Sequence, residues 1–226
     1  MIDLKIQLIL NTILKHIVSD GKVEVETVSK ETGLSENFIK DIIKDFGIEL
    51  DANTIKADPT TIVIKGWMRG FDIVQFALSI GWHELEKLCG EIFKRAGYEV
   101  ALNFRFKEGD KRHEIDLIVL HGETLFVIDC KRWSRIRTTA LKNAALAQKE
   151  RAGAFSRYIA RNGLALVSTS NTIRVYPMVI SVFSPQIKVY EGVLVVNLYQ
   201  LKGFLAEIEN YLYGLEFFET RIPRLI

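Results

Sequence analysis

The sequence HEIDLIVLHGETLFVIDCK fills residues 113–131 and decides the fold. Two mostly apolar runs of strand length are separated by the turn residues His121-Gly122-Glu123, which predicts an antiparallel hairpin with strands over 113–120 and 124–133. In the second strand, Asp129 and Lys131 are two residues apart and share a face, while Cys130 points to the opposite layer. The short turn also brings Asp116 near the end of the strand that carries Asp129.

The segments around this hairpin predict an α/β domain. A helix over 82–97 and a strand over 98–106 precede it, with a polar loop at 107–111. A long basic helix follows over roughly 138–161, and Asn162-Gly163 ends it. The order α-β-β-β-α-β indicates a mixed sheet. The rest of the chain predicts strand-like runs and a final amphipathic helix, at 164–169, 175–183, 193–197 and 198–213.

The N-terminal part predicts a small helical domain over residues 1–58. Helical patterns cover 4–18 and 24–32, and Ser35 caps a third helix that continues to Phe46. Two short β-like runs then follow. This order is that of a winged helix-turn-helix. Residues 59–80 read as a connecting segment, which leaves 81–226 as the second domain.

The composition describes a folded protein with no covalent cross-links. The chain has 226 residues, of which 48% are hydrophobic, and only 4 prolines and 15 glycines, which excludes fibrous and low-complexity classes. Cys89 and Cys130 are too few for a disulfide framework and suit a reducing compartment. No stretch approaches 18 apolar residues, and Asp3 is unlike the start of a signal peptide. We expect a soluble, cytoplasmic protein without membrane contact.

Charge is distributed unevenly around the net value of +2. Residues 1–58 contain 7 Lys and 11 Asp or Glu, a net of −4, whereas residues 131–161 contain 9 Lys or Arg and a single acid, a net of +8. The basic segment is a candidate footprint for a polyanion, and a solvated helix face is the alternative. The candidate DNA contacts in this segment are Arg132, Arg135, Arg137, Lys142, Lys149 and Arg151.

Two carboxylates and an ammonium on one face of the hairpin predict a metal site. Asp116 and Asp129, with the main-chain carbonyl of Cys130, form an oxygen-rich set suited to Mg²⁺ or Mn²⁺. Lys131 would then position a water and stabilise the charge on a transferring phosphoryl group. The alternative for Asp129 and Lys131 is a solvated charge pair worth ~0.2–1 kcal/mol.

With these residues, the segment 81–183 resembles the PD-(D/E)xK nuclease superfamily. It is most similar to Mrr-like restriction endonucleases and archaeal Holliday junction resolvases. The resemblance rests on Leu85-Glu86 ahead of Gly97-Tyr98, on Asp116 in EIDL, and on Asp129-Cys130-Lys131. It implies a restriction-endonuclease-like core, Glu86 as a metal or water ligand, Asp116 and Asp129 as metal ligands, and Lys131 as the catalytic lysine. Asp129 departs from the Glu that is commoner in the nearest relatives, and Gln148 falls where several relatives keep a polar residue.

Two functions therefore remain open. The first is a Mg²⁺-dependent DNA endonuclease that hydrolyses phosphodiesters and recognises the backbone more than the bases. The second is a non-catalytic DNA-binding or regulatory protein on a nuclease-like scaffold. Glu114 is either a further ligand or an ion-pair partner of Arg112 or Lys111.

The partners of the two ends of the chain are also open. The third N-terminal helix has Lys40 and Lys44 against three acids, so it either contacts DNA through Asn37 and these lysines or binds a protein partner. The C-terminal segment either covers its own sheet or forms the interface of a homodimer, as two-fold cutting by related nucleases requires. Its apolar residues are Leu201, Phe204, Leu205, Ile208, Leu212, Leu215, Phe217 and Phe218.

Overall fold

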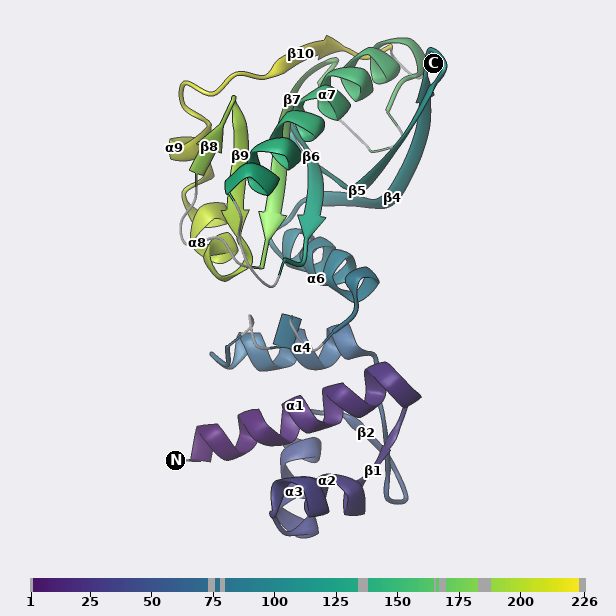
Figure 1. The fold of residues 1–226 in the computed structure, drawn as a ribbon, viewed down its shortest axis with the longest axis vertical. Helices are drawn as coiled ribbons and strands as arrows, with labels where there is room; N and C mark the ends of the chain where they lie inside the picture. The colour runs from purple at the N-terminus through teal and green to yellow at the C-terminus, as the bar shows by residue number, and fades with distance from the viewer. Residues whose placement is uncertain are drawn as a thin grey trace. The chain divides into compact units, whose positions relative to one another are not determined.

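The structure is a computed structural model that describes residues 2–72, 76–77, 80–133, 138–164, 166, 170–182 and 188–223 (Figure 1). The chain forms two compact units, Met1–Leu88 and Cys89–Ile226, whose boundary falls within helix α6 (Trp82–Arg95). The first unit contains α1 (Ile2–Asp20), β1 (Val23–Glu24), α2 (Val25–Thr32), α3 (Glu36–Asp45), β2 (Glu49–Asp51), β3 (Thr54–Lys56) and α4 (Pro59–Met68).

The first unit follows the element order expected from its sequence. Gly33 ends α2 in a left-handed conformation with φ 69°, and the Ser35 side chain caps α3 by accepting a hydrogen bond from the Phe38 N–H. The three short strands pair antiparallel in the order β1-β3-β2. Their core includes the apolar face of α1, where Ile9, Leu10, Ile13 and Leu14 are fully buried.

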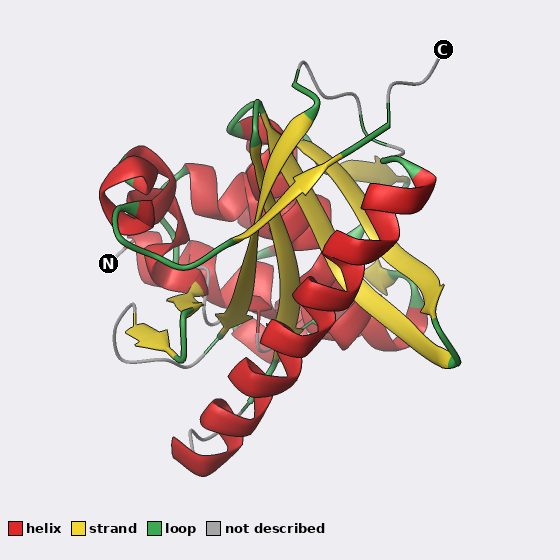
Figure 2. Cartoon of the chain, turned by 90° about the horizontal axis from the view of Figure 1, so that it is seen from above, coloured by secondary structure: helices red, strands yellow, loops and turns green. Residues whose placement is uncertain are grey.

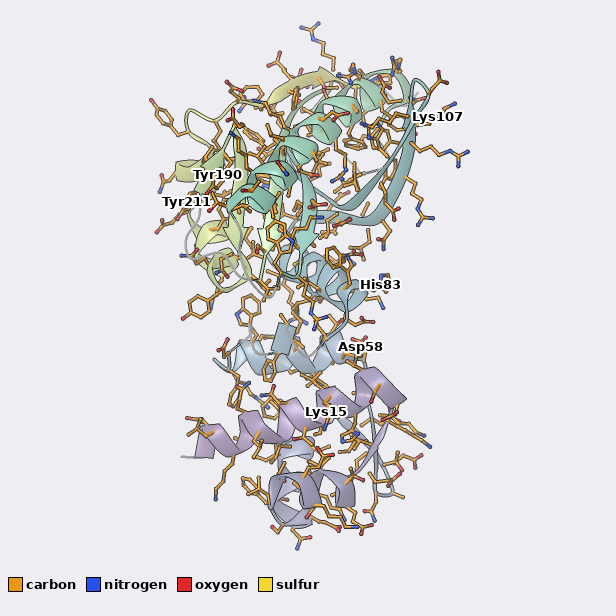
Figure 3. All side chains as sticks on the ribbon, viewed as in Figure 1. Lys15, Asp58, His83, Lys107, Tyr190 and Tyr211 are labelled. Carbon is orange, nitrogen blue, oxygen red and sulfur yellow. The ribbon has the colours of Figure 1, made fainter. Side chains whose placement is uncertain are left out.

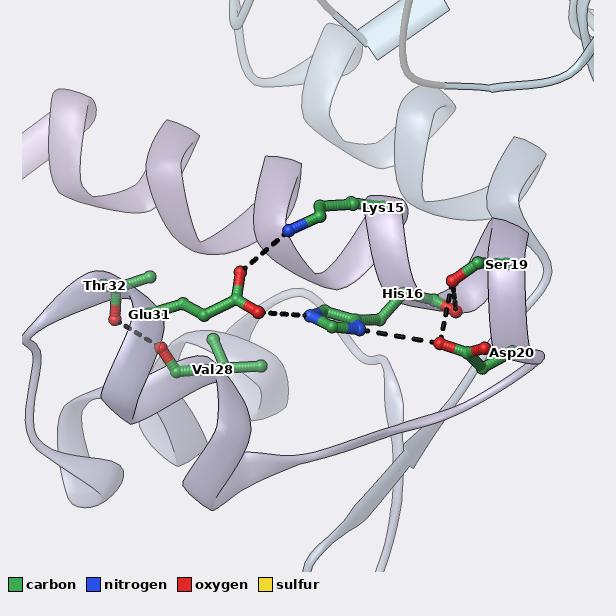
Figure 4. Close-up of polar contacts among 7 residues, drawn as sticks. All are labelled: Lys15, His16, Ser19, Asp20, Val28, Glu31 and Thr32. Carbon is green, nitrogen blue, oxygen red and sulfur yellow. Dashed lines mark hydrogen bonds and ion pairs between the residues drawn. The ribbon is translucent and has the colours of Figure 1, made fainter.

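A polar cluster joins α1 to α2 in this unit (Figure 4). His16 lies between two carboxylates: its Nε2 is 2.7 Å from Glu31 Oε1 and its Nδ1 is 3.6 Å from Asp20 Oδ2. Lys15 donates a hydrogen bond of 3.3 Å to the other oxygen of Glu31. The hydrogen bonds from His16 and Lys15 lower the pKa of the Glu31 carboxyl.

We expect Glu31→Gln to lower the melting temperature at neutral pH, and this difference to disappear in acid. Because the folded-state pKa of Glu31 is depressed, its stabilising contribution is present above the unfolded-state pKa and is lost as the pH falls through the folded-state pKa. Thermal unfolding followed by circular dichroism across the acid range measures this. Glu49→Gln is the control, since Glu49 is exposed; a Glu31→Gln effect that does not change with pH would contradict the prediction.

The second unit is built on a seven-stranded mixed sheet. Strands β4, β5 and β6 pair antiparallel, β6, β7 and β9 pair parallel, and the order is β4-β5-β6-β7-β9-β8, with β10 also on β7. The sequence prediction of an α/β core with a mixed sheet is confirmed. The elements are β4 (Glu99–Glu108), β5 (Lys111–His121), β6 (Thr124–Lys131), α7 (Thr138–Asn162), β7 (Thr172–Ser181), β8 (Lys188–Tyr190), β9 (Val193–Asn197), a 3-10 turn (Leu198–Gln200), α8 (Leu201–Ala206), α9 (Ile208–Leu212) and β10 (Phe218–Arg221).

Helices cover both faces of this sheet. The long helix α7 runs diagonally across one face (Figure 2), where Phe155 and Ile159 pack with Leu125 and Val127 of β6. On the other face, Phe126 of β6 meets Phe204 of α8 edge to face at a centroid distance of 6.3 Å, and Gly90 lets α6 approach β4. The alternation along β6 thus directs odd-numbered side chains toward α7 and even-numbered ones away from it.

Pro177 lies inside the central strand β7, where a missing N–H is normally costly. The pairing explains its position. On the side of β7 away from β6, β10 pairs with Thr172–Val175 and β9 pairs with Met178–Ser181. Pro177 therefore occupies the step at which β7 passes from one neighbouring strand to the other.

Several sequence predictions about this unit are wrong in detail. The predicted loop at 107–111 is mostly strand, because β4 and β5 continue to a turn at Gly109 and Asp110. The predicted single helix over 198–213 is broken at Glu207 into α8 and α9, and β8 and β10 were not predicted. The run at 164–169 lies largely outside the described residues. None of the described helices combines the length and the apolarity needed to span a bilayer.

Candidate active site

The face of β6 that meets α7 carries the predicted charged pair. Lys131 Nζ lies 2.8 Å from Asp129 Oδ2 and 3.0 Å from Oδ1, as their shared face predicted. Asp129 is 4% exposed, whereas the Lys131 side chain keeps 24% of its surface. Burying a carboxylate to this degree requires compensating charge, so the pair is not the solvated one considered as the alternative.

Cys130 lies between these two residues but points into the other layer. The pKa of the Cys130 thiol is raised well above its usual range. The main cause is a hydrogen bond with Cys89 of α6, and burial is the second cause. Both cysteines are buried and free. Cys130 therefore stays a neutral thiol at neutral pH, and its main-chain carbonyl is the group it can offer to a site.

Asp116 reaches the same end of β6 through an irregularity in the hairpin. The ladder between β5 and β6 runs from His121–Thr124 to Leu117–Ile128. Beyond it, Asp116 Oδ2 accepts a hydrogen bond of 2.7 Å from the Cys130 N–H. The carboxylate thus takes the place of a strand partner, which confirms the prediction that Asp116 lies beside the Asp129–Lys131 segment.

Asn103 of β4 accompanies this irregularity and was missed by sequence reasoning. It has φ 53°, in the left-handed region that Asn tolerates better than most residues. The register of β4 with β5 is Leu102–Leu117 on one side of Asn103 and Phe104–Ile115 on the other, so Asn103 lies across from Asp116. An Asn inside an apolar strand pattern was the available signal.

Helix α7 brings Arg151 to Asp129, and Gln148 to Arg151. Arg151 Nη1 lies 3.1 Å from Asp129 Oδ1 and also donates to Gln148 Oε1. Gln148 is fully buried, and its Nε2 donates a hydrogen bond of 2.6 Å to the main-chain carbonyl of Val127. Gln148 therefore ties α7 to β6 and orients Arg151. Sequence reasoning named both residues but did not join them to Asp129.

Glu86 lies on α6, one turn before Cys89, in the first unit. It is 5% exposed, its Oε1 accepts a hydrogen bond from the Trp82 indole, and its Oε2 is 3.7 Å from His83 Nδ1. Neither Trp82 nor His83 was singled out by sequence reasoning. Trp82 and His83 precede Glu86 by four and three residues, so the helical period over 82–97 was the available signal.

Apart from Arg151, the described basic residues predicted to bind DNA form no ion pair with Asp129, and neither does Glu114. Glu114 is exposed and pairs with Arg105 at 3.1 Å, and not with Arg112 or Lys111. Lys149 binds Glu216, Arg157 and Arg161 both bind Glu108, and Arg132 and Lys142 are exposed. At least five of the seven described cations in 131–161 thus have a carboxylate partner. Arg135 and Arg137 lie outside the described residues.

The donor chemistry at this site fits a hard divalent cation, with two carboxylates and a carbonyl. Among the residues that the structure describes, no group of three or more His, Cys, Asp and Glu side chains converges on one point. Lys131 and Arg151 already neutralise the buried charge of Asp129. A metal at Asp129 would therefore compete with these two cations.

Comparisons with known proteins concern mainly the second unit. Residues 81–180 match the model of the nuclease-related domain, NERD. An uncharacterized protein of Archaeoglobus fulgidus is 24% identical over 133 residues, which are 58% of this chain and 94% of that relative.

Two solved structures are also similar, at low identity. Protein VC1899 from Vibrio cholerae has a TM-score of 0.43 and 15% identity over 93% of this chain and 52% of its own. A protein of unknown function, AF1548, has a TM-score of 0.36 and 12% identity over 55% of this chain and 65% of its own. This chain thus spans about half the length of the Vibrio protein. Residues 81–180, which contain Glu86, Asp116, Asp129, Lys131, Gln148 and Arg151, are similar to the nuclease-related domain.

Proposed function

We propose that this protein is a metal-dependent DNA endonuclease of the PD-(D/E)xK type. The observation that carries the proposal is the buried Asp129, in contact with Lys131 and beside Asp116, within the segment that matches a nuclease-related domain. An acidic pair with a lysine at the end of a strand suits phosphodiester hydrolysis, in which negative charge develops on a phosphoryl group. Restriction-like and junction-resolving activities are both compatible with this chemistry.

Each side chain has a role in this proposal. Asp116, Asp129 and the Cys130 carbonyl would hold Mg²⁺ or Mn²⁺, and Glu86 would add a ligand to the ion or to its water. Such an ion, when bound, polarises the phosphodiester and lowers the pKa of its water. Lys131 orients the attacking water and stabilises the charge on the phosphoryl oxygens. Since a guanidinium and a metal ion repel each other, Arg151 would turn from Asp129 to a substrate phosphate.

The contact of Arg151 with Asp129 also favours a second candidate function. Lys131 and Arg151 already balance the negative charge of Asp129, so this carboxylate does not need a metal ion for its burial. A non-catalytic DNA-binding or regulatory protein is therefore the alternative. The two candidates differ in whether the site binds a divalent ion.

Cleavage and metal binding by the wild-type protein test the proposal. We expect Mg²⁺ or Mn²⁺ to support cleavage of at least one of linear, methylated and four-way-junction DNA, and EDTA to abolish it. Calorimetry should detect Mn²⁺ binding at or below millimolar concentrations. DNA binding without Mn²⁺ binding and without cleavage would support the second candidate instead.

We further propose that residues 1–58 form a winged helix-turn-helix domain. Its element order and its three-stranded sheet support this reading. Lys40 in α3 is 3.6 Å from Glu36, which reduces its availability to DNA. We therefore favour a protein partner for this acidic domain.

A cytoplasmic homodimer completes the proposal. Leu201 and Phe204 are buried in their own unit, so an interface at the C-terminal segment would use the exposed Phe217. Sedimentation of the full chain should show a species of two chains, and a species of one chain at tens of micromolar would contradict the dimer.

A further inference from the structure

A groove on the β4–β5 hairpin has three cations among its six lining residues. Its volume is about 610 Å³, and its lining residues are Arg105, Phe106, Lys107, Arg112, His113 and Glu114. Phe106 packs on Phe155 and Tyr158 of α7, at centroid distances of 5.4 and 5.2 Å. Because side chains alternate along a strand, Arg105 and Lys107 project from the face opposite to Phe106 (Lys107 is labelled in Figure 3).

Two positive charges on this face, those of Lys107 and Arg112, repel each other and destabilise the pairing of β4 with β5. Lys107 lies directly across from Arg112 in the register, and like charges in that position destabilise a strand pair. Arg105 is better placed, since Glu114 lies across from it at 3.1 Å. Lys107 reaches Asp110 only at 3.6 Å, with both side chains well exposed, and Arg112 makes no ion pair with any described residue. A bound anion would relieve this repulsion.

The hairpin that carries the groove packs on α7, the helix that carries Arg151. Phe106 stacks on His113 at 4.9 Å with an interplanar angle of 15°. Lys111, at the end of the same hairpin, forms an ion pair with Glu150 of α7, the residue before Arg151. The hairpin is therefore anchored to α7 beside Arg151, while the groove cations extend from its other face.

The groove lies on the same strand as Asp116. Arg112 precedes Asp116 by four residues, and a strand rises about 3.4 Å per residue, so their Cα atoms are about 14 Å apart. Because DNA presents a phosphate about every 3.4 Å of axis per strand, a duplex bound at Asp116 has phosphates within reach of the groove.

We propose that this groove binds the phosphate backbone of the DNA substrate, away from the cleaved bond. The inference rests on the proposed nuclease function and adds a contact outside the basic segment of α7. Lysine and arginine bind phosphates without reading the sequence, so the groove would set the register of the substrate and not its sequence preference.

DNA binding by charge variants of the full chain in EDTA tests the groove. We expect Lys107→Gln/Arg112→Gln to weaken binding of a duplex on the order of tenfold and to flatten the salt dependence by up to ~0.9 for each lost phosphate contact. Glu114→Gln should act in the opposite direction and strengthen binding. Lys94→Gln/Lys202→Gln is the matched control, because it removes the same charge from exposed lysines on α6 and α8.

The comparison between the two double variants decides the outcome. Equal weakening in both would mean that only the overall field of the protein matters, and it would overturn the groove. Since the measurement uses EDTA, it does not depend on cleavage. If Lys107→Gln/Arg112→Gln weakens DNA binding more than the control but the wild type never cuts DNA, only the proposed nuclease function is contradicted. If the wild type cuts DNA but the two double variants bind it equally well, only the groove is contradicted.

Discussion

Lys131→Met should reduce metal-dependent DNA cleavage on the order of 10²–10³-fold, the usual effect of removing one group that stabilises transition-state charge. Asp129→Asn should reduce cleavage at least as much, since the amide cannot provide the negative oxygen that a divalent cation requires. Both substitutions keep the approximate shape of the side chain. Initial rates on a DNA that the wild type cuts, at saturating Mg²⁺ or Mn²⁺, measure the effect.

The two variants differ in what they do to stability. Asp129→Asn leaves Lys131 and Arg151 facing each other without a carboxylate. Breaking a fully buried ion pair costs about 3–5 kcal/mol, and the cost here should be smaller because both cations keep 24% of their side-chain surface. Lys131→Met leaves Arg151 as a partner for Asp129. It should therefore lose activity with little change in melting temperature.

Lys94→Met provides the control for Lys131→Met, because Lys94 is exposed on α6. DNA binding in EDTA should stay within a few-fold of the wild type in all three proteins. Wild-type cleavage rates in Lys131→Met would remove this residue from the mechanism. The same result in Asp129→Asn would mean that the ligands of the ion are elsewhere.

The part of the site that the sequence predicts is the part set by neighbouring strands. A short turn between two strands fixes which end of one strand lies beside the other, so Asp116 could be located near the Asp129–Lys131 end of β6 from the sequence. The period of two along β6 places Asp129 and Lys131 on one face for the same reason. Neither inference requires knowledge of how the helices pack.

The contacts that sequence reasoning missed depend on the packing of distant elements. Arg151 meets Asp129 from 22 residues away because α7 crosses the sheet diagonally (Figure 2), and no local pattern fixes that crossing. The β10 strand pairs with β7 across a long interval of sequence. The break at Glu207 also leaves the apolar periodicity of 198–213 unchanged, so the periodicity alone predicts one continuous helix.

The basic segment shows how composition can mislead about a surface. Its charge of +8 makes it a candidate footprint for a polyanion, yet Arg157 and Arg161 both bind Glu108 of β4. Hydrogen bonds from Arg161 and then Arg157 lower the pKa of Glu108. The C-terminal half of α7 therefore uses its arginines to hold the β4–β5 hairpin. The net charge of a segment counts these arginines as if they were available to a ligand.

Gln148→Leu should lower cleavage about tenfold while lowering the free energy of unfolding by only ~1–3 kcal/mol, since two hydrogen bonds of ~0.5–1.5 kcal/mol each are lost at nearly constant volume. Gln148 is too far inside the protein to touch a substrate, as it is fully buried. Its effect on cleavage would come through Arg151, whose guanidinium donates to the Gln148 carbonyl. Asn143→Leu, at an exposed position of the same helix, is the control.

A double-mutant cycle tests whether Gln148 acts through Arg151. If Gln148 serves to orient the guanidinium, Arg151→Met alone should remove the benefit of Gln148, and the double variant should cleave no more slowly than Arg151→Met. The hydrogen bond to the Val127 carbonyl does not involve Arg151, so the stability cost of Gln148→Leu should persist in both backgrounds. Additive losses of cleavage in the double variant would show that Gln148 supports the site by a route other than Arg151.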